Sequence, residues 1–229
     1  MPTSAHRSLL ITIDGPAGAG KTTVSKMLAA RMGYRYLDTG ALYRAVAYMA
    51  RAAGIRVDDD RALGTLCRTL RLRIDDDRLL ADGVDIGGLI RTPDIAMLAS
   101  AVSARPAVRR ALLEIQRQMG AAGGLVAEGR DMGTVVFPRA DLKFFLDASV
   151  RQRARRRFDQ YGDAGRQTIA QIEADIRRRD RNDSRRDVAP LKPAADALII
   201  DSTAMTAQAV VARMMVSIRA CQDRSGGSL

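Results

Sequence analysis

The feature that most constrains the fold is the segment GPAGAGKT at residues 15–22. It fits the pattern G-x-x-x-x-G-K-[ST], follows the apolar run LLITIDG (residues 9–15) and precedes a helical pattern over residues 21–32. Glycines let successive backbone N–H groups point at phosphate oxygens, and the positive end of the helix dipole adds to the attraction. The segment therefore predicts a phosphate-binding loop (P-loop) at the end of a buried strand.

Two side chains of this loop are expected to handle a nucleoside triphosphate. Lys21 is predicted to bridge the terminal phosphates, and the Thr22 hydroxyl is predicted to ligate Mg²⁺. The residues predicted to bind ATP are Gly15, Pro16, Ala17, Gly18, Ala19, Gly20, Lys21, Thr22 and Thr23. The loop leaves the phosphate acceptor open, because water, a hydroxyl group or another phosphate could receive the transferred group.

Apolar runs alternate with helical patterns along most of the chain. The runs GLVAEG, LKFFLDA and ALIIDS are predicted to be three further buried strands. Spacing of apolar residues predicts helices at about 21–32, 41–53, 61–70, 95–104, 107–121, 150–161, 169–185 and 207–220. Such alternation is typical of a doubly wound, mostly parallel α/β sheet, which is the fold class we expect.

The pattern changes over residues 71–87. LRLRI alternates apolar and charged residues, and RLLADGVDIGG contains an Asp-Gly pair that signals a hairpin. A small antiparallel unit is therefore predicted to interrupt the α/β pattern. We expect one domain over 1–229, with the core sheet in about 9–60 and 97–220 and the insert in about 61–96.

Composition narrows the class of protein. Apolar residues make up 47% and charged residues 28%, which is typical of a globular chain. No window approaches the roughly 20 consecutive apolar residues of a membrane span. The segment MPTSAHRSLL lacks the apolar core of a secretory signal, and Cys67 and Cys221 suggest neither a disulfide framework nor a zinc site. We expect a cytoplasmic protein without a membrane partner.

The charge is strongly basic and dominated by arginine. Net charge is +11, and 33 of the 37 basic residues are Arg. Residues 151–186 hold twelve Arg against six acidic residues. A net charge of this size suits nucleic acid, a membrane surface or a small polyanion, and codon bias also produces arginine excess. Aromatic residues are only 4% and Trp is absent, which disfavours a single-strand stacking platform, so we expect no nucleic-acid partner.

Candidate general bases are scarce. The only histidine, His6, precedes the first predicted strand and is expected to have no catalytic role. A nucleoside monophosphate is already mostly dianionic at neutral pH, since its second pKa is about 6. Its phosphorylation needs positive charge more than a base, which suits the abundance of arginine. An Asp acting as base on a hydroxyl acceptor remains open.

Five segments occur in an order that resembles bacterial cytidylate kinases. They are ITIDGPAGAGKTT, LDTGALYR, AEGRDMGTVVFP, LKFFLDAS and RRDRNDSRRDVAPLKPAADALIIDST, and the resemblance spans residues 10–220. It implies phosphoryl transfer from ATP to CMP or dCMP with Mg²⁺, and it likens the hairpin insert to an enlarged monophosphate-binding subdomain. The alternatives are another P-loop kinase, acting on UMP, AMP or a hydroxyl metabolite, and a nucleic-acid-binding P-loop protein. We expect a monomer.

The resemblance implies acceptor-binding residues in the first half of the chain. Thr39 and Arg44 match positions that bind the acceptor phosphate, although Asp38 and Thr39 could simply cap a helix. Ser100 and Arg109 match positions that read cytosine. The next residue, Arg110, diverges on a helix and is expected to be a solvated arginine.

The second half supplies the remaining acceptor residues. Arg130 is expected to contact the acceptor phosphate, and Glu128 stands where the family often has Asp, so its contact with the cytosine amino group is left open. The neighbouring Asp131 is assigned either an organising or a structural role. Within RRRDRNDSRR, the resemblance implies that Arg179 and Asp183 contact the sugar and that Arg186 contacts the phosphate. These three residues would share one helix face if the helix persisted to Arg186.

A helical lid over ATP is implied for about residues 151–170. Arg153 and Arg157 are spaced i, i+4, as are Arg151 and Arg155, so either pair would share a helix face. Lid arginines are expected to neutralise charge on the transferred phosphoryl group, and we assign this role to Arg153 and Arg157. The predicted catalytic set is Lys21, Arg130, Arg153, Arg157 and Arg186.

Overall fold

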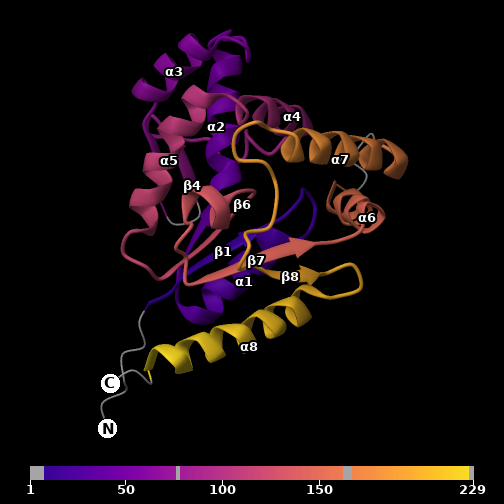
Figure 1. Ribbon diagram of the computed structural model, residues 1–229. Coiled ribbons are helices and arrows are strands. Elements are labelled where there is room, and N and C mark those ends of the chain that lie inside the picture. The colour runs from indigo at the N-terminus through magenta and orange to yellow at the C-terminus, as the bar shows by residue number, and fades with distance from the viewer. Residues whose placement is uncertain (1–7, 76–77, 162–166, 227–229) are drawn as a thin grey trace. The chain divides into compact units, whose positions relative to one another are not determined.

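The computed structural model describes residues 8–75, 78–161 and 167–226 (Figure 1). His6 and the segment between the two basic helices, residues 162–166, lie outside these ranges. The chain divides into two compact units. The first contains the residues up to Leu37, Gly120–Arg185 and those from Ala189 onward, and the second contains Asp38–Met119 and Arg186–Val188.

The first unit is built on a five-stranded sheet of order β2-β6-β1-β7-β8. Its strands are β1 (Leu10–Asp14), β2 (Arg35–Asp38), β6 (Leu125–Gly129), β7 (Leu142–Asp147) and β8 (Leu198–Asp201). β1 pairs in parallel with β6 and β7, and β7 pairs in parallel with β8. The parallel register puts Asp14 opposite Gly129, so the segments that follow these two strands leave from the same edge of the sheet.

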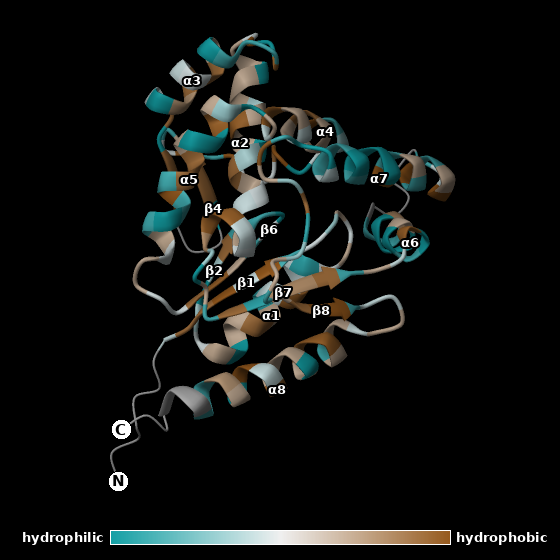
Figure 2. Cartoon of the chain, in the orientation of Figure 1, coloured by the Kyte–Doolittle hydropathy of each residue, from teal (hydrophilic) through white to brown (hydrophobic). Residues whose placement is uncertain are grey.

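Helices complete this unit. They are α1 (Lys21–Met32), the π-helix η1 (Met132–Val136), α6 (Val150–Tyr161), α7 (Ile169–Ser184) and α8 (Ala207–Gly226). Residues of α1 and α8 pack with the central strands in one core, which includes Ile13, Leu28, Leu146 and Met214. The strands are predominantly apolar in Figure 2, whereas α6 and α7 are largely hydrophilic. These two helices nevertheless pack together through a small apolar cluster formed by Ala154, Ile172 and Ile176.

The second unit combines four helices with a three-stranded antiparallel sheet. The helices are α2 (Thr39–Ala52), α3 (Asp60–Thr69), α4 (Pro93–Val102) and α5 (Pro106–Gly120, whose last residue belongs to the first unit), and the strands are β3 (Leu72–Asp75), β4 (Arg78–Ala81) and β5 (Val84–Asp85). Asp82 and Gly83 join β4 to β5 with φ of 49° and 85°. Positive φ at both central residues is what a tight hairpin turn of the favoured twist requires. The predicted hairpin is therefore confirmed.

The α/β fold with a parallel sheet is confirmed, and three local predictions differ from the structure. Strand β2 was not predicted, because it has four residues at the sheet edge and its sequence RYLD carries no apolar run. Helix α8 continues to Gly226, past the predicted end at residue 220. Helix α7 ends at Ser184, so it does not persist to Arg186, and the helix face that Arg186 was to share with Arg179 and Asp183 does not form. In the described ranges, no helix has the length and hydropathy needed to cross a membrane.

Candidate nucleotide-binding site

The P-loop wraps closely around its own lysine. Gly15 and Gly18 have φ of 149° and 78°, a region that favours glycine. A Cβ at Gly15 would lie 2.0 Å from the carbonyl oxygen of Leu146, so no other residue fits at the strand end. Lys21 begins α1, is only 6% exposed and donates from Nζ to the carbonyl oxygen of Pro16 at 2.8 Å. The loop thus has the compact form that the motif predicts.

Burial and charge together lower the pKa of Lys21 to about 7. Burial contributes most, and the positive charges of Arg130 and Arg179 lower it further. Glu128 and Asp14 act in the opposite direction. The P-loop lysine therefore interacts electrostatically with three residues that were predicted to bind the acceptor.

Asp14 connects the start of the P-loop to the segment after β6. Its Oδ1 accepts a hydrogen bond from the Met132 N–H and its Oδ2 one from the Gly133 N–H, both at 2.8 Å. Burial raises the pKa of this carboxyl to about 6 even though the two N–H donors oppose the shift. Sequence reasoning missed Asp14. Its signal was an acidic residue placed directly after the buried run LITI.

Arg130 and Asp183 form an ion pair. Nε of Arg130 donates to Oδ2 of Asp183 at 3.0 Å, and its Nη1 donates to the carbonyl oxygen of Gly129 at 3.1 Å. The Asp183 side chain is only 1% exposed. The structure thus pairs Arg130, which was predicted to contact the acceptor phosphate, with Asp183, which was predicted to contact the sugar.

Glu128 is held by a strand neighbour. The Tyr36 hydroxyl on β2 donates to Oε1 of Glu128, and the Lys26 ammonium lies 5.4 Å from the centroid of the Tyr36 ring. Glu128 is buried. Tyr36 was missed by sequence reasoning because the strand that carries it was not recognised.

In the second unit, Asp38 both caps α2 and holds Arg44. Its Oδ1 accepts from the Ala41 N–H at 2.9 Å, and its Oδ2 accepts from Nη2 of Arg44 at 2.7 Å. Nε of Arg44 is buried and has no hydrogen-bond partner among the described residues. Thr39 is buried as the first residue of α2. Asp38 therefore caps α2 and also binds Arg44, whose Nε has no protein partner among the described residues.

The two predicted base-reading residues lie around a third, Ser103. Arg109 donates from Nη1 to the Ser103 carbonyl oxygen at 3.2 Å, and the Ser103 hydroxyl donates to the Ser100 carbonyl oxygen at 2.9 Å. The Arg109 guanidinium lies 5.8 Å from the centroid of the Tyr43 ring. All four side chains are buried, whereas Arg110 is exposed as expected. Sequence reasoning missed Ser103 and Tyr43.

The arginines of α6 contact the P-loop backbone. Arg153 donates from Nη1 to the Ala17 carbonyl oxygen at 3.1 Å. Arg156, which was not predicted, donates from Nη1 to the Ala19 carbonyl oxygen at 3.2 Å and from Nη2 to the Ser202 carbonyl oxygen at 2.6 Å. The structure therefore brings Arg153 and Arg156 to the loop together.

The residues present fit Mg²⁺ held chiefly by a nucleotide. The Thr22 side chain is exposed in the first turn of α1, next to Lys21. Within residues 8–75, 78–161 and 167–226, no three His, Cys, Asp or Glu side chains gather as a metal site. Mg²⁺ in P-loop enzymes needs no such group, because phosphate oxygens, waters and one hydroxyl supply most ligands.

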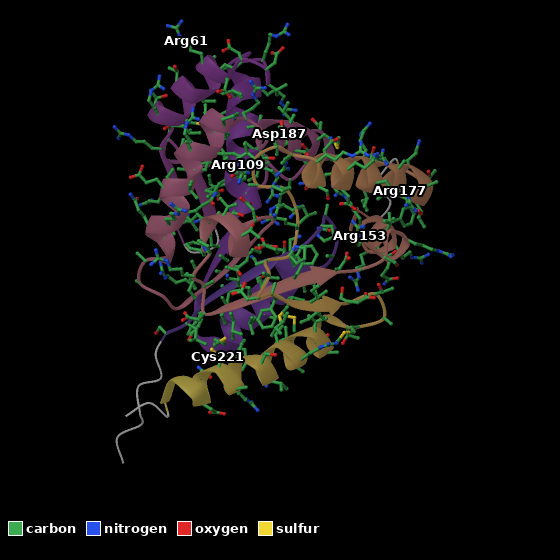
Figure 3. All side chains as sticks on the ribbon, in the orientation of Figure 1. Arg61, Arg109, Arg153, Arg177, Asp187 and Cys221 are labelled. Atoms are coloured by element: carbon green, nitrogen blue, oxygen red, sulfur yellow. The ribbon has the colours of Figure 1, made fainter. Side chains whose placement is uncertain are left out.

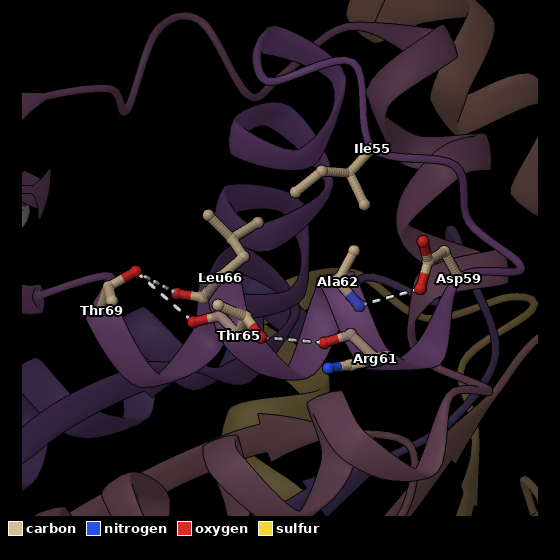
Figure 4. A pocket seen from close by; sticks show the side chains of 7 residues that line it. All are labelled: Ile55, Asp59, Arg61, Ala62, Thr65, Leu66 and Thr69. Carbon is tan, nitrogen blue, oxygen red and sulfur yellow. Dashed lines mark hydrogen bonds between the residues drawn. The ribbon is translucent and has the colours of Figure 1, made fainter.

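A separate pocket of about 410 Å³ lies on the second unit (Figure 4). It is formed by α3 and the segment that precedes it, with the lining residues Ile55, Asp59, Arg61, Ala62, Thr65, Leu66 and Thr69. Asp59 and Thr65 are engaged in the local bonding of α3, as N-cap and as donor to the Arg61 carbonyl oxygen. None of the predicted site residues lines this pocket.

Comparison with known proteins agrees with these features. The family model of cytidylate kinases matches residues 11–220. The cytidylate kinase of Citrifermentans bemidjiense is 47% identical and covers 93% of this chain and 94% of its own. That of Geobacter sulfurreducens is 45% identical over 100% of both chains. A gluconokinase structure from Sinorhizobium meliloti shares the fold at 14% identity, with a TM-score of 0.50 and coverage of 98% and 99%. The chain belongs to the cytidylate kinase family.

Proposed function

We propose that the chain transfers the γ-phosphoryl group of ATP to CMP or dCMP, with ADP and CDP or dCDP as products. An oxygen of the acceptor phosphate forms the new P–O bond while the bond between the γ-phosphorus and the bridging oxygen breaks. The observation that carries this proposal is the charge around Lys21, whose pKa responds to Arg130 and Arg179. Lys21, expected to bind ATP, and Arg130 and Arg179, expected to bind the acceptor, are thus close enough for their charges to interact. Such a cluster of positive charge suits the binding of two phosphate groups side by side.

The donor is proposed to bind the P-loop. Backbone N–H groups of residues 15–23 would receive the phosphates, and Lys21 would exchange its bond to Pro16 for the terminal phosphates. Thr22 would hold Mg²⁺, which supplies charge neutralisation on the phosphate oxygens when bound. Entry of a triphosphate beside Lys21 favours its protonated form.

The acceptor is proposed to be recognised in three parts. Its phosphate would take donors from Thr39, Arg44, Arg130 and Arg186. Its base would be read by Ser100 and Arg109, with Glu128 accepting from the amino group. Its sugar would meet Arg179 and Asp183. The dianionic phosphate needs no base, so cations and hydrogen-bond donors are the groups that matter.

The segment of about residues 151–170, which contains most of α6, is proposed to form the lid over ATP. Arg157 of α6 is half-buried and would neutralise charge on the transferred group. A closed lid also excludes water, which would otherwise receive the phosphoryl group. We further propose that the protein works as a cytoplasmic monomer that binds no nucleic acid.

A substrate panel tests the acceptor. We expect turnover of CMP and dCMP in an ADP-coupled assay and little or none of UMP and AMP. Arg109→Met and Ser100→Ala are expected to lower kcat/KM for CMP at least tenfold, because each removes a buried polar reader. Arg110→Met is the matched control, since its side chain is exposed on the adjacent position. Absence of CMP and dCMP turnover by the parent chain would sink the proposal.

A further inference from the structure

The Arg153 side chain donates to protein groups through Nε and Nη1. It lies on α6 (labelled in Figure 3) and is 5% exposed. Nε donates to the Ala148 carbonyl oxygen at 2.8 Å, and Nη1 donates to that of Ala17 at 3.1 Å. Nη1 also lies 2.7 Å from Oδ2 of Asp180 on α7. Its charge is thus paired with a carboxylate on another helix, and two of its three nitrogens are bonded within the protein.

The P-loop is shaped to receive this arginine. A Cβ at Gly18 would lie 3.1 Å from Cβ of Arg153 and 3.2 Å from its carbonyl oxygen, so α6 packs directly on the loop at this glycine. Backbone N–H groups that face a phosphate leave carbonyl groups turned away from it, and buried carbonyls need donors. Arg153 supplies that donor to Ala17, the residue before Gly18.

Helix α7 carries two aspartates that each pair with an arginine from another part of the first unit. Asp180 and Asp183 are three residues apart and so share a helix face. Asp180 pairs with Arg153, which bonds the P-loop, and Asp183 pairs with Arg130, whose charge acts on Lys21. Helix α7 therefore contacts the P-loop through Arg153 and also holds Arg130, the arginine whose charge acts on Lys21.

We propose that Arg153 is a positioning residue: together with Asp180 it ties helices α6 and α7 to the Ala17 carbonyl group and so sets the conformation in which the P-loop binds ATP. This inference rests on the proposed binding of ATP to the P-loop. It replaces the earlier expectation that Arg153 touches the transferred group. It also gives Asp180, which no motif singled out, a role in donor binding.

The sign of the effect at Asp180 separates positioning from simple electrostatics. Asp180→Asn removes a negative charge near a site for an anion, so electrostatics alone would tighten ATP binding. Positioning predicts the opposite, because Arg153 loses its charged partner and the loop loses its orientation. We expect the Kd of a non-hydrolysable ATP analogue, measured calorimetrically on the full chain without acceptor, to rise about tenfold. Unchanged or tighter binding would overturn the proposal.

Arg153→Lys tests the same linkage from the other side. Lysine keeps the charge but cannot reproduce the guanidinium's donors to Ala148, Ala17 and Asp180. We expect a similar rise in Kd, and a double variant Arg153→Lys/Asp180→Asn no worse than the poorer single variant, since both act through one linkage. A fall in kcat without a change in analogue affinity, with losses that multiply in the double variant, would instead indicate direct contact with the phosphoryl group.

Two further variants keep the test decisive. Asp159→Asn breaks the exposed pair of Arg155 and Asp159 on α6 and is expected to leave analogue binding unchanged. If Asp180→Asn does not fold, Arg153→Met/Asp180→Leu removes both charges at once and is expected to fold while still binding the analogue weakly. Normal affinity in this variant contradicts the proposal. A chain that binds the analogue but fails on CMP would refute the proposed acceptor alone.

Discussion

Nε of Arg130 donates to Oδ2 of Asp183 at 3.0 Å, and this pair joins the segment after β6 to helix α7. The carboxylate is almost fully buried, and it pairs with the arginine that we expect at the acceptor phosphate. Asp183 can therefore influence catalysis in two ways, by orienting Arg130 and by contacting the sugar.

Asp183→Asn is expected to separate these two effects. Loss of the charged partner should lower kcat/KM for CMP and dCMP together by at least tenfold, and lower the free energy of unfolding by about 3 kcal/mol. A sugar contact adds a further loss for CMP, so the CMP to dCMP ratio of kcat/KM should also fall. Equal losses would contradict the sugar contact. Glu173→Gln on the same helix breaks the more exposed pair with Arg177 and should change stability by no more than about 0.5 kcal/mol.

Lys21 should take up a proton when ATP binds at alkaline pH. Its pKa in the free protein is lowered to about 7, so most of the population is neutral at pH 8. Phosphate oxygens favour the ammonium form, which raises the pKa in the complex. Calorimetric titration at pH 8 in buffers of different ionisation enthalpy should give an uptake approaching one proton, which vanishes at pH 6 and in Lys21→Met. Zero uptake by the parent chain at pH 8 would contradict the low pKa.

Asp14 should produce an acid limb in activity without a matching loss of stability. Below its pKa of about 6, the protonated carboxyl accepts poorly from the Met132 and Gly133 N–H groups, so kcat should fall. The folded pKa lies above the ordinary value, so the folded state binds this proton more tightly than the unfolded state. This group's contribution to stability therefore rises as pH falls from 7 to 5, by about 1 kcal/mol.

Asp14→Asn provides the reference for that measurement, because every other titrating group is shared. Its activity should be low throughout and lack the acid limb. The free energy of unfolding of the parent chain relative to Asp14→Asn should increase between pH 7 and pH 5 in urea titrations. A decrease would show that the two hydrogen bonds outweigh burial and that the pKa is not raised.

Two P-loop glycines should differ in what an alanine does to the fold. Gly15→Ala would place Cβ 2.0 Å from a backbone oxygen of β7, so the loop and the sheet must move apart. Gly20, with φ of 93°, has only the Arg156 guanidinium near its Cβ position, at 3.7 Å. We expect Gly20→Ala to cost about 1–2 kcal/mol from backbone strain and Gly15→Ala clearly more. Thermal melting compares them, and equal costs would contradict the steric argument.

The P-loop, most of the strands and helices, and the hairpin at Asp82 and Gly83 could be predicted from the sequence. Each of these features depends on residues close together in the sequence. They are glycines suited to positive φ, the periodic spacing of apolar residues, and a lysine at a fixed sequence spacing after the first strand. The expected acceptor residues came from the resemblance to the family, and the structure pairs two of them, Arg130 and Asp183. Strand β2 escaped because a short edge strand owes its conformation to its neighbour in the sheet.

Tertiary structure alone decided how the charges are used. Arg153 and Arg157 are equivalent in a helical repeat, yet packing of α6 against Gly18 and α7 buries Arg153 against Ala17 and Asp180. Asp14 became a double acceptor only because β6 and η1 lie beside β1. Partners more than 20 residues apart leave no periodic signal in a single sequence, and burial, which shifts the pKa values of Asp14 and Lys21, exists only in the folded chain.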